Sequence, residues 1–597
     1  MQEFSAPPSF QIPPGAEVTS VVFDHAARTP GQVVFQRPIG TSWHDVTAAE
    51  FAESVLAVAK GLIASGVGAG DRVAILSGTR YEWVLLNFAV WAAGGCVVAI
   101  YETSSADQAG WILADSGTTL LVVETAKHRA IVGEVAATLP QPSEILELDA
   151  DGIGELRRRG AGLGDEVVHL RRAGLGAPSP ATLIYTSGTT GRPKGVCLSH
   201  GNLYAESAGA RAAMAEIYVE NGRTLLFLPL AHIFAQVVML GAFDSKVVVR
   251  LTADWSALGA EFAAFKPTVV FAVPRVFEKI YHGARLKARD KGRGRIFDSA
   301  VATAVAYSEA LENKGPGPGL RLRHAVFDRL VYGKLRGALG GECTSALSAG
   351  APLSPRLGHF FRGIGVPIYE AYGLTETTAG IVMNTPRHQR IGSVGRPLPG
   401  HAVRVAADGE LFLRGPVVFD GYWNNPAATD AALIDGWFAT GDLGAIDADG
   451  YVRITGRKKE IIVTAGGKNV SPALLEDSLC AHPLVDRCMV VGDGMPFIGA
   501  LITLDPEALP GWIERSAVPR DSTVEQLIGH PVLLAELEAA VAETNGRFSK
   551  AEGIRKIRVL AATWSVEGGE LTPKMSIKRD IVRKKYAADV DAIYSAD

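Results

Sequence analysis

Short runs of β-branched and apolar residues alternate with longer segments of helical spacing from about residue 71 onward. The clearest stretch begins with a strand-like run at 224–230, passes through an amphipathic segment at 255–266 and reaches a further apolar run that ends at Pro274. Strands that are apolar on both faces indicate parallel sheets covered by helices on both sides. We therefore predict an α/β fold with a large N-terminal domain of doubly wound sheets.

The composition and the hydrophobic pattern of the sequence change at three further places. A segment at 285–323, rich in Lys, Arg and Gly, predicts a helical insert. After Gly395, short strands with turn signals predict an appended region of antiparallel β-hairpins. The last part has a mixed pattern that predicts a small α+β domain. We expect an N-terminal domain at 1–456, a hinge at 457–460 and a C-terminal domain at 461–597.

Composition narrows the classes of function. The 59 Lys and Arg against 63 Asp and Glu give a net charge of −4, which argues against a nucleic-acid binder. The 5 cysteines are scattered and form no CxxC, so we expect a reducing cytoplasm, and the first residues lack a signal-peptide pattern. The uncharged run at 83–101 is split by Gly94 and Gly95, so we read it as a buried helix followed by a buried strand and not as a membrane span.

The segment YTSGTTGRPKG at 185–195 follows the apolar strand ATLIY. Its glycines allow backbone N–H groups to turn inward, and its hydroxyls and Lys194 add donors and a cation, which predicts a polyphosphate site. GxxxxGK[ST] is absent, so this is not a Walker A loop and an ADP-forming phosphotransferase is disfavoured. The structural alternative is a surface loop of ordinary Ser, Thr and Gly composition.

This loop resembles the signature of the adenylate-forming superfamily, which includes acyl-CoA synthetases, luciferases and the adenylation domains of peptide synthetases. Five further segments resemble that family's motifs and occur in its order: AHIF at 231–234, SAGAP at 348–352, YEAYGLTET at 369–377, TGD at 440–442 and ITGRKKE at 454–460. Together they cover about residues 40 to 590. The resemblance implies an acyl-CoA synthetase-like fold.

Activation of a carboxylate with ATP requires neutralised phosphates, a held nucleoside and a carboxylate oxygen in line with the α-phosphorus. The resemblance implies that Glu376 and Thr186 hold Mg²⁺. It also implies that Tyr372 and Gly373 contact adenine opposite Gly350 and Ala351. The residues expected at the ATP or AMP site are Thr186, Ser187, Gly188, Thr189, Thr190, Gly191, Lys194, Gly350, Ala351, Tyr372, Gly373, Thr375, Asp442 and Arg457.

Asp442 can accept hydrogen bonds from both ribose hydroxyls, and Arg457 can pair with a phosphate or the ribose. His232 follows a predicted strand at a strand-to-helix junction, where side chains line the mouth of an open α/β sheet, so we expect it at the carboxylate or phosphate. Each residue has a plainer alternative: a lone Tyr372 can be core, and a lone TGD is a turn. His232 is as easily structural. Gln236 stands where relatives place an aromatic gate over the acyl tunnel, which weakens the expectation of a gate here.

The family places a lysine near the C-terminus that bridges the carboxylate and the α-phosphate. Here that position holds Ser576, with Lys574 and Lys578 two residues to either side. In an extended segment these three residues share a face, so either lysine could substitute. We expect Lys574 to be catalytic, with Lys578 as the alternative. A third reading is that both lysines start a basic, solvated helix.

The resemblance implies that the small C-terminal domain is mobile and swings between the two steps of the reaction. Lys459 matches the hinge between the domains, where backbone freedom matters more than side-chain type. Gly466, Gly467 and Lys468 follow the hinge closely and are candidates to face CoA after the small domain swings.

Two segments, VPRVFEKIY at 273–281 and TAGGKNVSP at 464–472, resemble long-chain fatty acyl-CoA synthetases in particular. The implied reaction consumes a fatty acid, ATP with Mg²⁺, and CoA, and yields acyl-CoA, AMP and pyrophosphate. Two alternatives stay open: an acyl-AMP ligase that uses a carrier protein, and a nucleotide-binding regulator whose adenylation is impaired because of Ser576. The basic stretch at 574–585 predicts peripheral contact with anionic lipid at the inner face of the membrane, and a homodimer also stays open.

Overall fold

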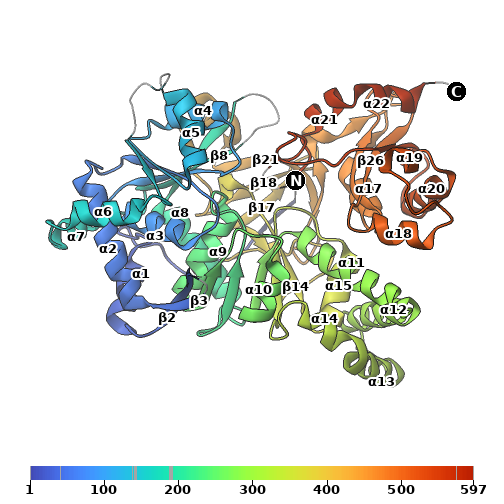
Figure 1. The fold of residues 1–597 in the computed structure, drawn as a ribbon, viewed down its shortest axis with the longest axis horizontal. Helices are drawn as coiled ribbons and strands as arrows, with labels where there is room; N and C mark the ends of the chain where they lie inside the picture. The colour runs from blue at the N-terminus through green and yellow to red at the C-terminus, as the bar shows by residue number, and fades with distance from the viewer. Residues whose placement is uncertain are drawn as a thin grey trace.

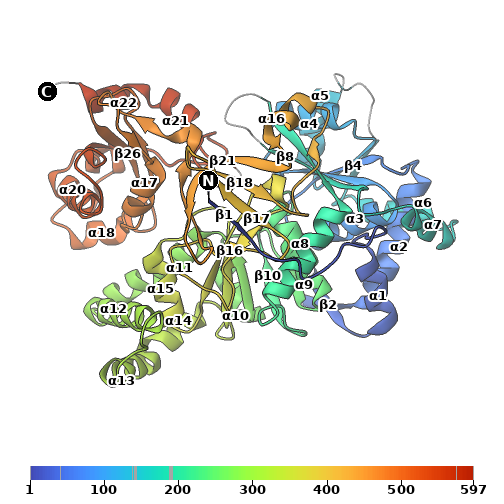
Figure 2. The ribbon, with the colours of Figure 1, turned by 180° about the vertical axis from the view of Figure 1, so that it is seen from behind.

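The computed structural model describes residues 2–40, 42–136, 139, 144–186, 192–572 and 575–595. A large N-terminal body carries four sheets, and a smaller C-terminal body, orange to red in Figure 1, lies beside the hairpin region and the helical insert. Figure 2 shows the same arrangement from behind. The predicted α/β class, with a large N-terminal and a small C-terminal domain, is confirmed.

The first sheet has seven strands in the order β19-β9-β8-β5-β4-β6-β7. β4 pairs in parallel with both β5 and β6, as expected for a doubly wound sheet. The strands are β4 (Arg72–Leu76), β5 (Cys96–Ile100), β6 (Leu120–Val123), β7 (Glu144–Glu147), β8 (Pro180–Thr186), β9 (Lys194–Ser199) and β19 (Gly421–Tyr422). The accompanying helices are α1 (Ser20–Arg28), α2 (Ala48–Ala64), α3 (Tyr81–Ala92), α4 (Ala106–Ser116), α5 (Ala126–Ala136), α6 (Gly152–Gly160), α7 (Glu166–Ala173) and α8 (His200–Ala213).

The uncharged run at 83–101 forms most of α3 and all of β5, and both are buried, as predicted. Trp83, Phe88 and Trp91 fill the core that α3 shares with α2. Among the helices described here, none has the length and apolarity needed to cross a membrane. The residues of this apolar run are therefore buried in the protein's own core.

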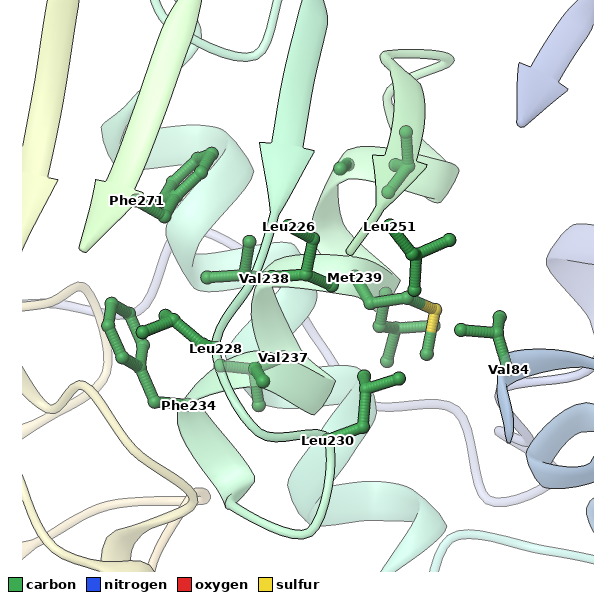
Figure 3. Packing of buried hydrophobic residues seen from close by; sticks show 14 of the residues in the cluster. Val84, Leu226, Leu228, Leu230, Phe234, Val237, Val238, Met239, Leu251 and Phe271 are labelled. Carbon is green, nitrogen blue, oxygen red and sulfur yellow. The ribbon is translucent and has the colours of Figure 1, made fainter. Parts of the chain in front are cut away.

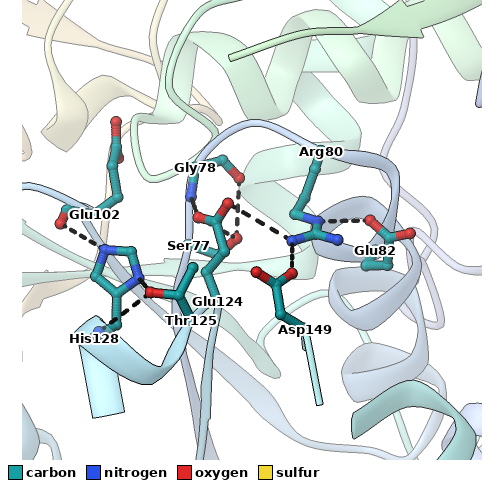
Figure 4. A network of polar contacts seen from close by, with 9 residues as sticks. All are labelled: Ser77, Gly78, Arg80, Glu82, Glu102, Glu124, Thr125, His128 and Asp149. Carbon is teal, nitrogen blue, oxygen red and sulfur yellow. Dashed lines mark hydrogen bonds and ion pairs between the residues drawn. The ribbon is translucent and has the colours of Figure 1, made fainter. Parts of the chain in front are cut away.

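Polar contacts fasten the carboxyl ends of β4 and β6 (Figure 4). The Glu124 carboxylate accepts a hydrogen bond of 2.7 Å from the Gly78 amide, so the turn after β4 is tied to the strand beside it. Arg80 lies 3.6 Å from Glu124 and 2.9 Å from Asp149, which follows β7. These contacts fix the edge of the sheet from which the loops extend.

Two further sheets carry the remaining apolar runs. The second has the order β10-β11-β2-β3 and the third β12-β13-β14-β15-β16. Their strands are β2 (Val33–Ile39), β3 (Ser42–Thr47), β10 (Arg223–Leu226), β11 (Val248–Leu251), β12 (Val269–Ala272), β13 (Ser345–Ser348), β14 (Ile368–Tyr372), β15 (Val382–Met383) and β16 (Arg396–Pro397). Three helices pack beside them: α9 (Ile233–Asp244), α10 (Leu258–Phe265) and α15 (Pro355–Gly363).

The helical insert is longer than the predicted 285–323. It consists of α11 (Pro274–Asp290), α12 (Gly294–Leu311), α13 (Pro318–Phe327), one π-helical turn (Asp328–Tyr332) and α14 (Gly333–Gly337). Pro274 stands at the first turn of α11, where its fixed φ favours a helix start and no N–H is needed, so the helix begins directly after β12. In both ribbon views α13 lies at the tip of the insert.

The region after Gly395 is antiparallel, as predicted. β1 (Gln2–Ser5), β17 (Ala402–Val405), β18 (Glu410–Arg414), β21 (Trp437–Ile446) and β20 (Leu433–Ile434) follow one another in one sheet, and β22 (Val452–Arg457) pairs with β21. α16 (Pro426–Ala432) leads into β20. The register places Asp442 directly opposite Arg457.

The C-terminal body is mixed. It contains a hairpin of β23 (Ile462–Val463) and β24 (Asn469–Val470), and a sheet of β25 (Val485–Val491), β26 (Ile498–Leu504) and β27 (Ile554–Leu560). Its helices are α17 (Pro472–Cys480), α18 (Leu509–Arg515), α19 (Val524–Leu527), α20 (Pro531–Asn545), α21 (Arg579–Lys585) and α22 (Ala587–Tyr594). A core around Leu475, Ile502 and Leu537 belongs to this body alone. Between the two bodies, Lys458–Glu460 forms a short 3₁₀ turn.

Candidate active site

A cavity of about 1970 Å³ lies between the two bodies and extends into the N-terminal one. Ordinary ligand pockets hold about 300–1,000 Å³, so this one has room for more than one small molecule. Its wall includes the ends of β8, β14, β21 and β22, together with α9, α11 and α17. One part of the wall is polar and another is apolar.

Asp442 is the best-anchored residue of the polar part. It is 3% exposed, and its Oδ1 accepts from Arg457 Nε at 2.9 Å while its Oδ2 accepts from the Tyr372 hydroxyl at 2.7 Å. Burial raises the pKa of Asp442, and Arg457 and Tyr372 offset part of that rise. Burial and the adjacent Asp442 also raise the pKa of Tyr372, which stays a neutral donor. The three side chains form one network on the cavity wall.

Glu376 lies on the same wall in a second polar group. Its Oε1 accepts from the Tyr422 hydroxyl at 2.9 Å, and Lys194 Nζ lies 4.9 Å from the centre of the Tyr422 ring. Burial and the neighbouring Glu376 raise the pKa of Tyr422, so the hydroxyl keeps its proton. Thr186 lines the cavity nearby, at the end of β8.

The phosphate loop connects two antiparallel strands, β8 and β9, and α8 begins only at His200. Anion binding at the loop would therefore depend mainly on backbone N–H groups and side chains, because the next described helix begins well after it. Five of the predicted loop residues lie outside the described part of the chain: Ser187, Gly188, Thr189, Thr190 and Gly191.

Two of the predicted nucleotide-site glycines stand where the backbone or its packing requires glycine. Gly350 has a φ of 84°, a left-handed conformation that favours glycine, and it lines the cavity with Ala351. A Cβ on Gly373 would lie 1.5 Å from the carbonyl oxygen of Ala379, so no other residue fits there. Thr375 lines the cavity beside them. All predicted ATP-site residues that the structure describes thus face one cavity, although their roles remain predictions.

The apolar part of the wall is built around α9. Leu228, Phe234, Val237, Val238 and Phe271 line the cavity. Figure 3 shows Phe234, Leu228 and Phe271 on one side of the helix, whereas Met239 points the other way, toward Leu251 and Val84. An α9 that is apolar all round can therefore serve both the core and the cavity.

His232 caps α9 and also lines the cavity, with its Nδ1 accepting from the Phe234 amide at 3.0 Å. The position of His232 is therefore compatible with both alternatives, a structural role as a helix cap and a role at the carboxylate or phosphate. Gln236 is buried, and its Nε2 donates to the Leu230 carbonyl at 3.0 Å. It points into the protein and is absent from the cavity wall, so it is no gate.

Two acidic residues on the wall, Glu206 and Glu370, were not among the predicted site residues, although Glu370 belongs to the motif at 369–377. Glu206 of α8 is buried, accepts from the Gly380 amide at 3.2 Å, and leaves its Oε2 without a hydrogen-bond partner among the described residues. Burial raises the pKa of Glu206 well above its usual range and that of Glu370 to about 8. Burial thus favours the protonated form of both carboxyl groups, and only burial, which sequence does not give, identifies them.

The C-terminal segment departs from the expected geometry. Lys574 lies outside the described residues. Ser576 lines the cavity, whereas Lys578 is not part of the wall. The prediction of an extended segment is wrong: Leu571 bridges Ile577, the Thr572 amide donates to the Ser576 carbonyl at 2.8 Å, and Met575 has a φ of 64°. A tight turn at this point removes the argument that the two lysines share a face.

The predicted hinge residue Lys459 is exposed and lines the cavity between the bodies. The predicted CoA-facing residues Gly466, Gly467 and Lys468 form the turn between β23 and β24, away from the cavity wall. Lys468 Nζ lies 3.2 Å from Glu552. In the conformation described here these three residues do not reach the site.

Arginines connect the two bodies, and sequence reasoning missed their roles. Arg275 of α11 pairs with Asp486 and lies 3.9 Å from Asp505. Arg579 pairs with Glu476 inside the small body and lies 3.5 Å from Glu460, which ends the segment between the two bodies. Only the fold shows that these distant segments meet.

Comparison with known proteins agrees with this architecture. Residues 22–423 match the family described as AMP-binding enzyme, and residues 459–597 match the AMP-binding enzyme C-terminal domain. The solved structure of the ATP-bound RpMatB-BxBclM chimera B1 superimposes with a TM-score of 0.71 at 24% identity, covering 96% of this chain and 99% of that one. The chain therefore belongs to the AMP-binding enzyme family, as the motifs indicated.

Within that family, two relatives match from end to end. The chain is 51% identical over 600 residues to the long-chain-fatty-acid–CoA ligase FadD15 of Mycobacterium bovis, with 100% of both chains covered. The FadD15 of Mycobacterium tuberculosis shows the same identity and coverage.

Proposed function

We propose that this protein is an enzyme that converts a long-chain fatty acid to its acyl-CoA in two steps. The fatty carboxylate first attacks the α-phosphorus of ATP, giving acyl-AMP and pyrophosphate. The CoA thiol then attacks the acyl carbonyl, giving acyl-CoA and AMP. One observation carries the proposal: a single cavity joins a polar wall around Asp442 and Glu376 to an apolar wall along α9.

The polar wall suits a nucleotide. Asp442 can accept from ribose hydroxyls while it orients Arg457, and adenine would lie in the part of the cavity lined by Tyr372 and Gly350. Lys194 and the amides of the loop would neutralise the phosphates. The apolar wall suits an alkyl chain and is formed by Leu228, Phe234, Val237, Val238 and Phe271. His232 directly precedes α9 in the sequence and also lines the cavity.

Mg²⁺ fits this donor set in the way that nucleotide-bound Mg²⁺ is usually held. Within the part of the chain that the structure describes, there is no cluster of three or more His, Cys, Asp or Glu able to form a protein cage for a metal. Mg²⁺ typically uses one or two carboxylates and completes its shell with phosphate and water. Glu376 would supply the carboxylate and Thr186 a hydroxyl, and the ion would neutralise charge on the phosphates.

The small domain would serve the two steps in turn. We propose the division at 1–456, 457–460 and 461–597, with Lys459 at the hinge and Gly466, Gly467 and Lys468 facing CoA only after the small domain rotates. In support, the inter-body contacts include side-chain ion pairs such as Arg275 with Asp486, which can break and reform. Lys574 remains the proposed adenylation lysine, because Lys578 is off the cavity wall.

The five cysteines of the described chain are all free, which suits a protein of the reducing cytoplasm. ATP and CoA are available there, and fatty acid can be supplied from the inner face of the membrane.

The test is release of AMP and pyrophosphate from palmitate, MgATP and CoA, for wild type beside Lys574→Ala and Lys578→Ala. We expect acyl-CoA formation by the wild type without any carrier protein, loss in Lys574→Ala, and near-normal activity in Lys578→Ala. Loss in Lys578→Ala alone would overturn the assignment of the lysine. Acyl transfer only to a carrier-protein phosphopantetheine would replace the CoA ligase with an acyl-AMP ligase.

Ser576 favours one second candidate, a nucleotide-binding regulator with impaired adenylation. The residue faces the cavity where a bridging cation is expected, and a serine cannot neutralise phosphate. ATP binding by calorimetry without AMP release from any fatty acid would support this candidate against the ligase.

A further inference from the structure

The helix α13 at the tip of the insert has an outward face that nothing in the described chain covers. None of its residues is buried. Leu322 is 71% exposed, Val326 49% and Leu330 57%, and they recur every four residues along the continuous helical segment 318–337. Side chains at this spacing lie on one face, so they form a single apolar stripe. We call these three residues the tip stripe.

The stripe is held outward by contacts on the other side of the segment. His324 stacks on Tyr307 with ring centres 3.9 Å apart, and its Nε2 lies 2.6 Å from the Gly363 carbonyl oxygen. The Tyr332 hydroxyl donates to the Ala300 carbonyl at 2.7 Å. The segment is therefore anchored to α12 and α15, and the stripe cannot turn inward without breaking these contacts.

Cations surround the stripe. The segment 318–337 carries Arg321, Arg323, Arg329, Lys334 and Arg336 against one acidic residue, Asp328, which pairs with Arg336 at 2.6 Å. Arg321, Arg329 and Lys334 are exposed, and no ion pair with any described residue involves them. An exposed apolar stripe flanked by free cations is the composition of a helix that lies in a membrane interface.

We propose that the tip stripe and its flanking cations dock this protein on an anionic lipid bilayer. Leu322, Val326 and Leu330 would enter the boundary between headgroups and acyl chains, and Arg321, Arg329 and Lys334 would contact lipid phosphates. The charges favour lipid over a second copy of the chain, because a two-fold interface through this face would set like charges opposite one another. The apolar centre of the face likewise favours lipid over nucleic acid.

Docking at the tip would place the enzyme at its substrate. The same insert begins with α11, whose Arg275, Lys279 and His282 line the cavity between the bodies. Long-chain fatty acids dissolve in bilayers, so a docked insert gathers substrate near that cavity. This benefit rests on the proposed function, whereas the docking itself needs no turnover and is tested without it.

The docking surface differs from the C-terminal basic helix that the sequence first indicated. Arg583, Lys584 and Lys585 are exposed on α21, but Lys585 is paired with Glu570. The described face of α21 also lacks a stripe of the tip's length, with Ile581 as its exposed apolar residue. The tip therefore has both an exposed apolar stripe and free cations, whereas α21 has mainly the cations.

The experiment is co-sedimentation of the purified full chain with vesicles of phosphatidylcholine alone or with about one third phosphatidylglycerol. We compare the stripe variant Leu322→Ser/Val326→Ser/Leu330→Ser and the charge variant Arg321→Glu/Arg329→Glu/Lys334→Glu. The matched control, Leu170→Ser/Val219→Ser/Ile434→Ser, removes three apolar side chains that are 72%, 52% and 43% exposed elsewhere. ATP binding by calorimetry in lipid-free buffer checks that each variant is folded.

We expect wild type and control to bind anionic vesicles, and each tip variant to lose binding by about tenfold or more. Salt should weaken the wild type, since the cations contribute. Equal binding by wild type and both tip variants would overturn the proposal, as would loss only on reversal of Arg583, Lys584 and Lys585. A dimer in light scattering that the stripe variant dissociates, without vesicle binding, would assign the face to a second copy instead. None of these results depends on whether acyl-CoA is formed.

Discussion

Arg457 Nε lies 2.9 Å from Asp442 Oδ1, directly across the pair of strands β21 and β22. Asp442 is buried beside the cavity and Arg457 is half exposed, so the pair presents a fixed acceptor and a cation to whatever enters. Because the register of two antiparallel strands sets this contact, it is in place before any ligand binds.

We expect Asp442→Ala to weaken ATP binding by about tenfold or more, because charged hydrogen bonds contribute roughly 1.5–3 kcal/mol and Arg457 would lose its orienting partner. Calorimetry with ATP measures the change. Asp449→Asn, on the neighbouring turn, serves as the control, since Asp449 pairs with Arg390 at 2.8 Å away from the cavity. An unchanged Kd in Asp442→Ala would refute the ribose role.

Tyr422 tests the proposed Mg²⁺ site because its hydroxyl donates to Glu376, the carboxylate proposed to hold the ion. Tyr422→Phe keeps the ring under Lys194 but removes the hydroxyl that donates to Glu376. We expect about a two- to fivefold increase in the Mg²⁺ concentration needed for half-maximal pyrophosphate release, since the carboxylate loses an orienting contact. Tyr422→Ala should add weaker ATP binding. If the Mg²⁺ dependence of Tyr422→Phe matches wild type, Glu376 does not act through this contact.

Ser576→Lys should restore a cation at the cavity wall. Because Ser576 lines the cavity and Lys578 does not, we expect this substitution to rescue adenylation by about tenfold in the Lys574→Ala background, while Lys578→Ala has little effect. Single-turnover formation of acyl-AMP is the measurement. No gain in the double variant would mean that position 576 does not reach the α-phosphate during adenylation.

The ion pair of Arg275 and Asp486 should hold the small domain. Their side chains are 19% and 14% exposed, so removal of one leaves a partly desolvated charge. We expect Arg275→Ala to speed proteolytic cleavage near 457–460 several-fold and to change the ratio of the two half-reactions. Lys279→Ala is the control, because Lys279 and Glu507 are 58% and 76% exposed and such pairs contribute about 0–1 kcal/mol. Equal cleavage of both variants would contradict the prediction.

The free energy of unfolding should decrease at acidic pH because His200 is buried in its neutral form. The side chain is fully buried at the start of α8, and burial lowers its pKa to about 4. The unfolded chain binds the proton near pH 6.5, so stability is complete above that pH and is lost as pH falls toward about 4. Urea unfolding at several pH values should show a loss on the order of 2–3 kcal/mol from this group.

His200→Gln should flatten this acid dependence while His388→Gln, at an exposed position, should not. Identical pH profiles for His200→Gln and wild type would show that other groups cause the acid loss.

Local pattern sufficed for much of the architecture. The uncharged run at 83–101 divides into α3 and β5 as predicted, because strand and helix periods are short-range properties of the chain. The insert was underestimated because its first helix begins at Pro274, directly after the apolar run and before the Lys-, Arg- and Gly-rich composition that marked the insert in the sequence. The C-terminal segment was misread because the turn at Met575 depends on a bridge between Leu571 and Ile577 that the local sequence does not announce.

The sequence by itself determined the fold class, the family and several of the residues that line the cavity, because motifs such as YGLTE and TGD carry their chemistry within a few adjacent positions. Only the tertiary structure decided that Tyr422 donates to Glu376, that Arg275 meets Asp486 and that Gln236 turns away from the cavity. It also decided that Leu322, Val326 and Leu330 stay uncovered. Those outcomes depend on which distant segments the chain path brings together, and amino-acid spacing along the chain does not encode them.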